Sequence, residues 1–251
     1  MKPECFLNIT SRYGETGAHG VIRLAILADW LQEAATISAN SLNFGEKTMQ
    51  QQGLTWVLVR QKLNIQRLPQ AGEALRVRTW PSLYDRFGHR GYELYDATGQ
   101  CLVHGVSAWA VMHLQTRKMV ALPQTILAEY PKDLYPCAPF SSKSLPRVHT
   151  LDHECILRVR QDDLDSNGHV NNAHYLSWLL ECLPNTEYSA LSMLDISFRA
   201  ETFPGEELLS LCAHAEQTAT GWQRAHAIRR PAGEDVCRAL LAWTTRHDER
   251  L

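Results

Sequence analysis

The sequence predicts an α+β fold of two similar units, each with a long central helix wrapped by a curved antiparallel sheet. Two runs, at residues 21–37 and 170–183, are apolar around nearly the whole helical circumference. Each is followed by tracts that alternate apolar and polar residues with the period of a strand, as at residues 75–80. A helix that is apolar on every side needs cover on most sides, and a curved sheet supplies that cover. Two such units side by side make a tandem (double) hotdog fold.

The chain contains an internal repeat. Three short segments of the first half recur in the same order in the second half: residues 30–33 at 178–181, residues 72–75 at 205–208, and residues 108–109 at 242–243. The last two pairs are separated by nearly the same number of residues. Each match alone is weak, because short matches arise by chance. Their shared order indicates the duplication of one helix-plus-sheet unit.

Each unit places its helix before most of its strands. Strands are expected over residues 75–80, 92–95 and 101–113 in the first unit, and over 208–215, 222–228 and 236–244 in the second. Pro184 ends the second helical run. A stretch rich in Pro and Ser is expected to be a linker. The sequence therefore predicts an N-terminal hotdog unit at residues 1–135, a linker at 136–150 and a C-terminal hotdog unit at 151–251.

Composition narrows the class of protein. The chain has 251 residues, of which 45% are hydrophobic and 21% charged, as is ordinary for a globular protein. A net charge of −2 gives no overall attraction to nucleic acid or to an anionic membrane. Seven cysteines, an odd number without a C-x-x-C pair, argue against a disulfide framework. Because the start of the chain lacks a signal-peptide pattern and no apolar run is long enough to span a membrane, we expect a cytoplasmic protein.

The most unusual polar stretch lies directly before the second helical run. In an extended segment alternate side chains share a side, so Asp165, Asn167 and His169 are expected to project together. The helix start that follows offers unpaired backbone N–H groups and a positive dipole end, which suit a developing oxyanion. A carboxylate, an amide, an imidazole and an oxyanion site together provide what acyl transfer to water needs. The same spacing equally fits a capped helix after an acidic turn, with Asn167 as the N-cap.

This stretch resembles a known family motif. The segment D-L-D-S-N-G-H-V-N-N-A-H-Y-L-S-W-L-L-E, which starts at Asp163, is similar to the D-x-D-x-N-x-H-V-N-N-x-x-Y-x-x-W-x-x-E motif of acyl-acyl carrier protein thioesterases. Residues 55–60 and 107–112 also resemble that family. The resemblance implies a tandem hotdog fold and hydrolysis of a fatty acyl-acyl carrier protein thioester to free fatty acid. It implies acyl carrier protein as the partner and neither a metal nor an organic cofactor.

The resemblance also assigns roles to residues. It implies that Asp165, Asn167 and His169 are catalytic, together with Glu201, which is expected on a strand after the helix. Thr202 stands where plant members often carry a cysteine, so we expect water rather than a thiol to attack the thioester.

Further residues are expected around this centre. The backbone N–H groups of Val170 and Asn171 are predicted to stabilise the oxyanion, and Asn172 and Glu181 to support the site. A helix-end charge that reaches solvent is an equal alternative for Glu181. Replacing His169 or Glu201 should cost a large part of kcat, whereas Asp165 acting as a nucleophile stays open.

The duplication predicts one active site rather than two. Leu68 takes the position of Glu201, counted back from the turn glycine that follows each. His19, matched with His169, has Gly17 two residues earlier in place of the amide. The first unit is therefore expected to bind the acyl chain and not to catalyse.

Three other functions stay open. They are a hotdog thioesterase that acts on acyl-coenzyme A, a 3-hydroxyacyl thioester dehydratase, and a non-catalytic acyl-binding protein. Docking of an acidic carrier protein would need a basic patch, for which Arg76 with Arg78, or Arg224 with Arg229 and Arg230, are candidates. His169 and His174 are five residues apart, which does not fit a zinc pair, so we expect no metal. A monomer and a homodimer both fit the sequence.

Overall fold

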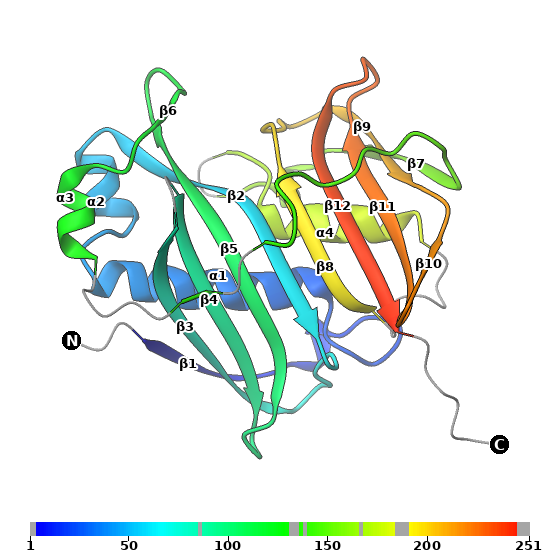
Figure 1. Cartoon of the computed structure of the whole chain (residues 1–251), viewed down its shortest axis with the longest axis horizontal. Helices are drawn as coiled ribbons and strands as arrows, with labels where there is room; N and C mark the ends of the chain where they lie inside the picture. Colours follow the sequence, from blue (N-terminus) through cyan, green and yellow to red (C-terminus); the bar gives the residue numbers. More distant parts are fainter. Residues whose placement is uncertain are drawn as a thin grey trace.

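The computed structural model describes residues 4–84, 87–130, 136–137, 140–165, 168–183 and 191–244. The strands join in one antiparallel sheet with the order β1-β3-β4-β5-β2-β8-β12-β11-β9-β7, while β6 pairs with β5 and β10 with β11 (Figure 1). The strands of the first half are β1 (Cys5–Thr10), β2 (Leu54–Ile65), β3 (Ala74–Tyr84), β4 (Phe87–Asp96), β5 (Cys101–His113) and β6 (Met119–Val120). Those of the second half are β7 (His153–Arg158), β8 (Leu191–Phe198), β9 (Glu207–Cys212), β10 (Glu216–Thr218), β11 (Gly221–Arg229) and β12 (Asp235–Thr244).

The sheet is built from two copies of one strand plan. Read from its outer edge inward, the first half runs β1-β3-β4-β5-β2 and the second runs β7-β9-β11-β12-β8. The two copies meet where β2 and β8 pair antiparallel, from Arg60 opposite Ser197 to Asn64 opposite Met193. This arrangement confirms the predicted α+β tandem hotdog fold, whereas the exact bounds of the predicted units and linker stay predictions.

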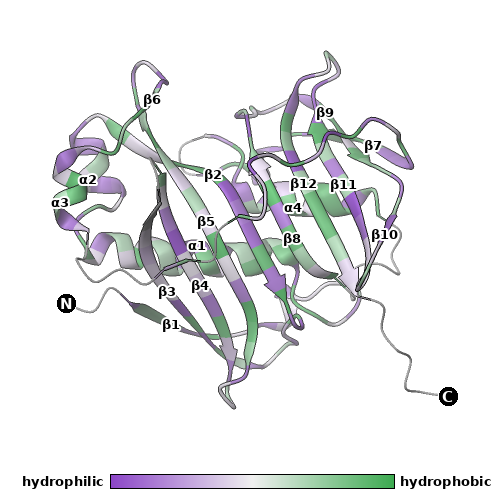
Figure 2. Cartoon of the chain, in the orientation of Figure 1, coloured by the Kyte–Doolittle hydropathy of each residue, from purple (hydrophilic) through white to green (hydrophobic). Residues whose placement is uncertain are grey.

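Two central helices, α1 (Leu24–Ser41) and α4 (Asn172–Glu181), lie against the same face of the sheet and contact each other (Figure 1). Leu27, Leu31 and Leu179 have no exposed surface and belong to one core that both units share. In Figure 2 the first turns of α1 are coloured as apolar, whereas α4 mixes apolar and polar residues. Two short helices, α2 (Glu46–Gln51) and α3 (Gln124–Glu129), lie beside the far end of α1. The shared core fixes the start of α4 relative to the first unit, which positions the site described below.

Three expectations about elements need correction. The first helix begins at Leu24 rather than residue 21, because Val21 and Ile22 form β-bridges with Gln70 and Thr16. The helix is not buried all round, since its second half exposes a strip that includes Ile37. The strand expected at 208–215 is β9, which ends at Cys212. The edge strands β1 and β7 were not predicted, because each is a short segment that lies outside the longer alternating tracts.

Candidate active site

The polar loop before α4 folds as a tight turn. Leu164 and Val170 form an isolated antiparallel bridge, and the backbone N–H of Asp165 donates to the carbonyl of His169 at 2.7 Å. Gly168 closes the turn with a φ of 77°, a left-handed conformation that favours glycine. The carboxylate of Asp165 accepts the backbone N–H of His169 at 3.1 Å. Asp165 therefore holds the backbone of His169, whereas Asn167 lies outside the described residues.

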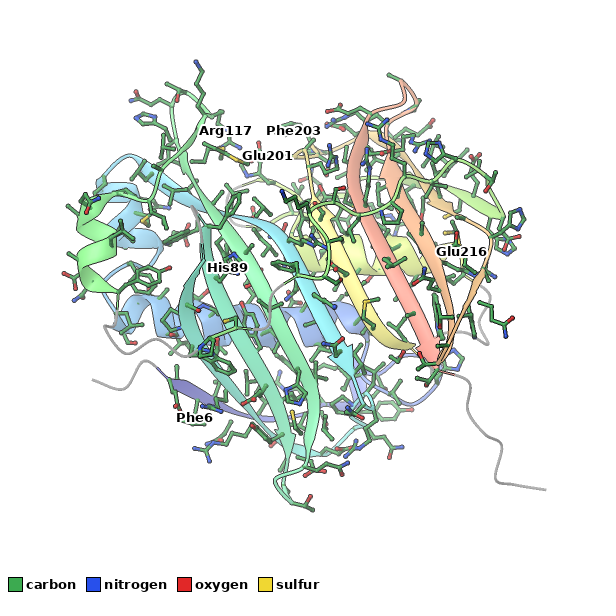
Figure 3. All side chains as sticks on the ribbon, viewed as in Figure 1. Phe6, His89, Arg117, Glu201, Phe203 and Glu216 are labelled. Atoms are coloured by element: carbon green, nitrogen blue, oxygen red, sulfur yellow. The ribbon has the colours of Figure 1, made fainter. Side chains whose placement is uncertain are left out.

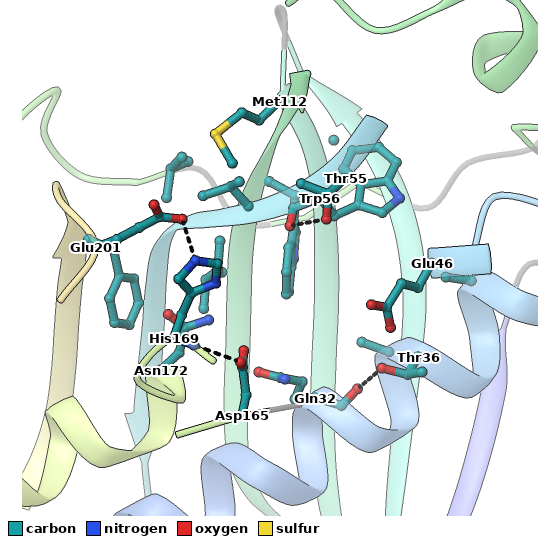
Figure 4. A pocket seen from close by; sticks show the side chains of 18 of the residues that line it. Gln32, Thr36, Glu46, Thr55, Trp56, Met112, Asp165, His169, Asn172 and Glu201 are labelled. Carbon is teal, nitrogen blue, oxygen red and sulfur yellow. Dashed lines mark hydrogen bonds and ion pairs between the residues drawn. The ribbon is translucent and has the colours of Figure 1, made fainter. Parts of the chain in front are cut away.

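The loop brings His169 to Glu201. The imidazole Nε2 lies 3.9 Å from the Glu201 carboxylate Oε1, and the two side chains are 29% and 37% exposed (Figure 4). The ring of Phe203 lies edge-on to the imidazole at 5.9 Å between centroids. The two residues are thus juxtaposed at the opening of a cavity, as the sequence led us to expect. Their catalytic roles stay predictions.

Glu201 lies in a loop and not on a strand, which corrects the expected position. β8 ends at Phe198 and the chain then turns towards α4. The buried hydroxyl of Thr202 is 2.7 Å from the phenol of Tyr175, and Arg230 donates to the backbone carbonyl of Glu201 at 2.6 Å. The residue beside Glu201 therefore anchors the loop, and the carboxylate is free to face His169.

The first unit supplies a residue that the sequence interpretation missed. Arg117, in the turn between β5 and β6, donates from Nη2 to Oε1 of Glu201. Arg117, Glu201 and Phe203 lie together at one end of the sheet (Figure 3). Arg117 has a φ of 54°, and its N–H donates to the carbonyl of His113 at 2.9 Å. The same carboxylate oxygen therefore faces a guanidinium of one unit and an imidazole of the other.

The start of α4 differs in detail from the expected oxyanion site. The N–H of Asn171 donates to the carbonyl of Asp163 at 2.9 Å, so the bridge next to it uses the group predicted to bind an oxyanion. The side chain of Asn171 accepts from the N–H of Ala173 at 3.1 Å, which makes Asn171 the N-cap of α4 in place of Asn167. The N–H of Val170 has no hydrogen-bond acceptor among the described residues and stays the candidate oxyanion donor.

A carboxylate of α1 lies under this helix start. Nδ2 of Asn171 donates to Asp29 at 3.2 Å and so ties α4 to α1. Burial raises the pKa of Asp29, although the hydrogen bond from Asn171 opposes the rise. Asp29 was not predicted, because no spacing in the sequence relates it to the loop 140 residues later. Its role in the structure is to hold the two central helices together at the site.

The two residues predicted to support the site behave differently. Asn172, the first residue of α4, lines the cavity next to His169 (Figure 4). Glu181 is the last residue of α4 and is exposed. Because nine residues of helix separate it from Asn172, Glu181 lies about 13 Å along the axis from the site. Its predicted supporting role is wrong, and it is a helix-end charge that reaches solvent.

A cavity of about 640 Å³ extends from the site into the first unit. Asp165, His169 and Glu201 line one part of it (Figure 4). The other part is lined by α1, β2, β4 and β5, with a wall of aromatic and apolar side chains: Phe44, Trp56, Leu58, Met112 and Tyr130. The rings of Phe44 and Tyr130 stack at 4.9 Å between centroids. A volume of this size is ordinary for a small-molecule site, and its apolar wall suits a hydrocarbon chain.

Comparison with known proteins places this architecture in a family. Residues 8–130 match the family described as acyl-ACP thioesterase N-terminal domain, and residues 149–245 match acyl-ACP thioesterase C-terminal domain. The chain belongs to the acyl-ACP thioesterase family. Within it, a chloroplastic acyl-[acyl-carrier-protein] hydrolase of Cuphea viscosissima is 28% identical over 254 residues, which cover 94% of this chain and 61% of the relative.

Two further members show the same relationship. A chloroplastic palmitoyl-acyl carrier protein thioesterase of Gossypium hirsutum is 28% identical over 262 residues, which cover 96% of this chain and 63% of the relative. The chain thus spans about three fifths of the length of these plant relatives. The crystal structure of an acyl-ACP thioesterase from Bacteroides thetaiotaomicron is 25% identical, with a TM-score of 0.84 and coverage of 96% of this chain and 98% of that one.

The equivalent loop of the first unit corrects the match between the two halves of the chain. Thr16 and Ile22 form a bridge like that of Leu164 and Val170, and Gly20 repeats the left-handed turn of Gly168. This register matches Asp165 with Gly17, Asn167 with His19 and His169 with Val21. His19 is therefore not the counterpart of His169, as the sequence suggested. The conclusion of a single site is strengthened, because the first loop lacks all three side chains.

Potential metal ligands gather away from this site. Among the described residues, Cys182, Cys212 and His226 place their ligand atoms within 4.8 Å of one another, and all three are buried. Cys182 follows the far end of α4, whereas His169 precedes its start. The sequence interpretation missed this group, because its members come from three separate parts of the chain. The expectation that the protein binds no metal stays a prediction.

The predicted basic patches are largely neutralised. Arg78 pairs with Glu4 and Glu93, and the buried Arg224 pairs with Asp152. Arg229 and Arg230 also pair with carboxylates. Of the predicted residues only Arg76 is exposed without an ion pair among the described residues, and its guanidinium stacks on Phe6 at 4.1 Å from the ring centroid. These arginines do not form a strong docking surface for an acidic partner.

Proposed function

We propose that the protein hydrolyses a fatty acyl-acyl carrier protein thioester to a free fatty acid and the carrier protein. The observation that carries this proposal is the contact of His169 Nε2 with Glu201 at 3.9 Å, at the mouth of a cavity of about 640 Å³ with an apolar wall. Membership of the acyl-ACP thioesterase family supports it. A carboxylate beside an imidazole is suited to general base catalysis, and the cavity is suited to the acyl chain.

The geometry supports a mechanism in which water is the nucleophile. Glu201 orients His169, and the imidazole takes a proton from a water molecule as its oxygen forms a bond to the thioester carbonyl carbon. The carbonyl oxygen becomes an oxyanion, which the N–H of Val170 is placed to stabilise. When the intermediate collapses, the C–S bond breaks and the imidazolium returns its proton to the thiolate sulfur. Asp165 holds the backbone of His169 throughout.

Water attack accounts for the residues next to Glu201. Thr202, at the position where plant members often carry a cysteine, is buried and its hydroxyl contacts Tyr175 at 2.7 Å. Two of the described cysteines, Cys182 and Cys212, lie together with His226 beyond the far end of α4, away from the cavity. Asp165 as a direct nucleophile is less favoured, because its carboxylate already accepts the backbone N–H of His169. We therefore assign the base to the imidazole and its orientation to Glu201.

Three alternatives are separated by their products. An acyl-coenzyme A thioesterase would release acid faster from coenzyme A than from the carrier protein. A 3-hydroxyacyl dehydratase would form an enoyl thioester and release no thiol. An acyl-binding protein would retain the thioester unchanged. The dyad of His169 and Glu201 at the cavity argues for catalysis over binding alone, and the choice of carrier is part of the proposal.

The decisive assay measures thiol release from acyl carrier protein loaded with acyl groups of several lengths. His169→Ala and Glu201→Gln should each lower kcat by roughly 10²–10⁴-fold if they take part in proton transfer. His214→Ala and Glu154→Gln serve as matched controls, because both side chains are exposed and lie away from the cavity. Turnover near wild type in both active-site variants would exclude the assignment.

Location and assembly stay proposals. We propose a cytoplasmic protein and leave open whether it is a monomer or a homodimer. Among the described residues, no helix combines the length and the apolar character needed to cross a bilayer. The two units already pair through β2 and β8 as two separate hotdog chains would, so a further copy is not needed to complete the sheet.

A further inference from the structure

One buried charge in the cavity is not explained by the proposed mechanism. Arg90 lies on β4, between Pro81 of β3 and Ser107 of β5. Side chains alternate along a strand, so Arg90 shares a face with Tyr92 and Leu94, which belong to the core under α1. Arg90 is only 5% exposed, and it lines the same cavity as His169. Its guanidinium is therefore directed towards the interior and not towards bulk solvent.

Arg90 differs from the other buried arginines of the described chain in its partners. Arg60 is paired with Asp195 at 2.8 Å, Arg238 with Asp235 at 2.6 Å, and Arg224 with Asp152. Arg90 makes one side-chain hydrogen bond among the described residues, from Nη1 to the hydroxyl of Thr79 at 3.3 Å. It has no carboxylate partner there, although three of its equally buried counterparts do.

The ionisable groups around Arg90 do not balance its charge. Burial raises the pKa of Tyr130 to about 12 and that of Cys137 to about 11, and it also raises the pKa values of Tyr92 and Cys5. These groups are therefore uncharged near neutral pH. Burial lowers the pKa of Arg90, yet a guanidinium stays protonated in proteins. Arg90 therefore has no anionic partner among the described residues, although the carboxylates of Glu46, Asp165 and Glu201 line the same cavity elsewhere.

An uncompensated buried charge is costly, so natural proteins retain one mainly where a ligand or a function needs it. A ligand oxygen that reaches Arg90 would replace the missing counterion. Arg90 lies on β4, which is the third strand from β8, so the two strands are about 14 Å apart along the sheet. Glu201 comes after the end of β8, which places it on the other side of the cavity lining from Arg90 in the strand order. The matching ligand atom therefore belongs to the far part of the acyl chain and not to the thioester.

We propose that Arg90 is a binding site for an oxygen function on the far part of the acyl chain, with a carboxylate bound most tightly. A guanidinium binds a carboxylate through two parallel hydrogen bonds, a hydroxyl through one, and a methyl group through none. The substrate class is then an acyl thioester whose chain ends in a carboxylate or hydroxyl. This inference rests on the proposed function only in naming the ligand as an acyl chain, and binding tests it without hydrolysis.

The test compares three primary amides of fatty acids of equal length, whose far ends are a methyl group, a hydroxyl or a carboxylate, each at several lengths. The amide removes the head carboxylate, which could otherwise pair with Arg90 itself. Their Kd values are measured by calorimetry at fixed salt for wild type, Arg90→Met and Arg76→Met. Arg76→Met is the matched control, because Arg76 is exposed on the outer face of the neighbouring strand. In wild type and the control, the carboxylate-ended amide should bind at least about tenfold more tightly than the methyl-ended amide. Arg90→Met should reverse that order.

The outcomes separate this inference from the proposed function. The same order of Kd values in wild type and Arg90→Met would overturn it, even if methyl-ended thioesters are hydrolysed well. An order that depends on Arg90, without any thiol release, would support it while excluding the hydrolase. If the methionine variant does not fold, the same Kd values are measured with Arg90→Gln. Arg90→Met should melt no lower than wild type, because it removes a buried charge that has no counterion among the described residues. A markedly lower Tm would assign Arg90 a structural role instead.

Discussion

Removing the contact between Arg117 and Glu201 should have a small effect on stability and a larger effect on catalysis, and the two effects can be measured separately. Both side chains are more than a third exposed, at 39% and 37%, so the ion pair is screened by solvent. Pairs of this kind contribute about 0–1 kcal/mol to folding. Arg117→Ala should therefore lower the free energy of unfolding by less than about 1 kcal/mol, which is a few degrees of Tm at most for a chain of this size.

The effect on catalysis should be much larger. Arg117 Nη2 and His169 Nε2 face the same oxygen of Glu201, so the guanidinium fixes where the carboxylate stands relative to the imidazole. Displacing a catalytic group by about 1 Å can cost roughly 10²-fold in rate. We expect Arg117→Ala to lower kcat about 10- to 100-fold with little change in KM, and Arg117→Lys to recover part of the loss.

A double-mutant cycle tests whether Arg117 acts through Glu201. The kcat of wild type, Arg117→Ala, Glu201→Gln and the double variant is measured by thiol release, with Tm recorded for each. If Arg117 positions the carboxylate, its removal should have little further effect once Glu201 is glutamine. Equal losses from Arg117→Ala in both backgrounds would refute the reasoning, as would a kcat that rises when Arg117 is removed.

Other predictions follow from single contacts. Burial alone would raise the pKa of Asp235, but hydrogen bonds from two arginines overcome this and lower it. The stabilising contribution of Asp235 is therefore complete above its unfolded-state pKa and is lost as pH falls through its lower folded-state pKa. Asp235→Asn should lower the free energy of unfolding at pH 7 by about 3–5 kcal/mol in urea, because Arg238 is left buried without this partner. The difference between the variant and wild type should shrink in acid. A Cβ at Gly88 would lie 2.8 Å from the hydroxyl of Tyr130, so it would narrow the part of the cavity that Tyr130 lines. Gly88→Ala should therefore shift the acyl-length profile of thiol release to shorter chains. An unchanged profile would show that Gly88 does not line the acyl pocket. Gly168→Ala meets no atom within 4 Å but must adopt a positive φ, so a loss of about 1–2 kcal/mol is expected by thermal unfolding, and none would contradict the turn geometry.

Local patterns in the sequence were sufficient for the fold and for part of the site. The strand over Cys101–His113 was predicted to the residue. The meeting of His169 with Glu201 was also expected, since the resemblance to a family joined two segments that spacing alone could not relate. The edge strand β1 was not predicted, because the strands were sought in the tracts that follow each helical run and β1 precedes the first run.

What escaped the sequence depends on pairing between distant segments. Asp29, Arg117 and Arg90 reach the site through the packing of α1 and through the register of β4 and β5, and no local spacing encodes either. Asn171 rather than Asn167 caps α4, because the bridge between Leu164 and Val170 delays the start of the helix. The error in matching His19 with His169 has the same origin. The two histidines were aligned by residue type, whereas the bridge and the turn glycine set the true register.

The first unit shows why only one of two equivalent positions is expected to carry the reaction. Its counterparts of His169 and Glu201 are Val21 and Leu68, and both pack against the shared core. Leu68 is 7% exposed, whereas the side chain of Glu201 is 37% exposed and faces a cavity. The equivalent position in the first unit is therefore occupied by apolar side chains that pack in the core. It does not merely lack the polar groups of the second unit. The cavity at the surviving site draws its walls from this same unit, together with Arg117 and Arg90. One unit thus has the loop that carries His169, and the other supplies the apolar wall of the cavity and both arginines, so neither unit is expected to be active without its neighbour.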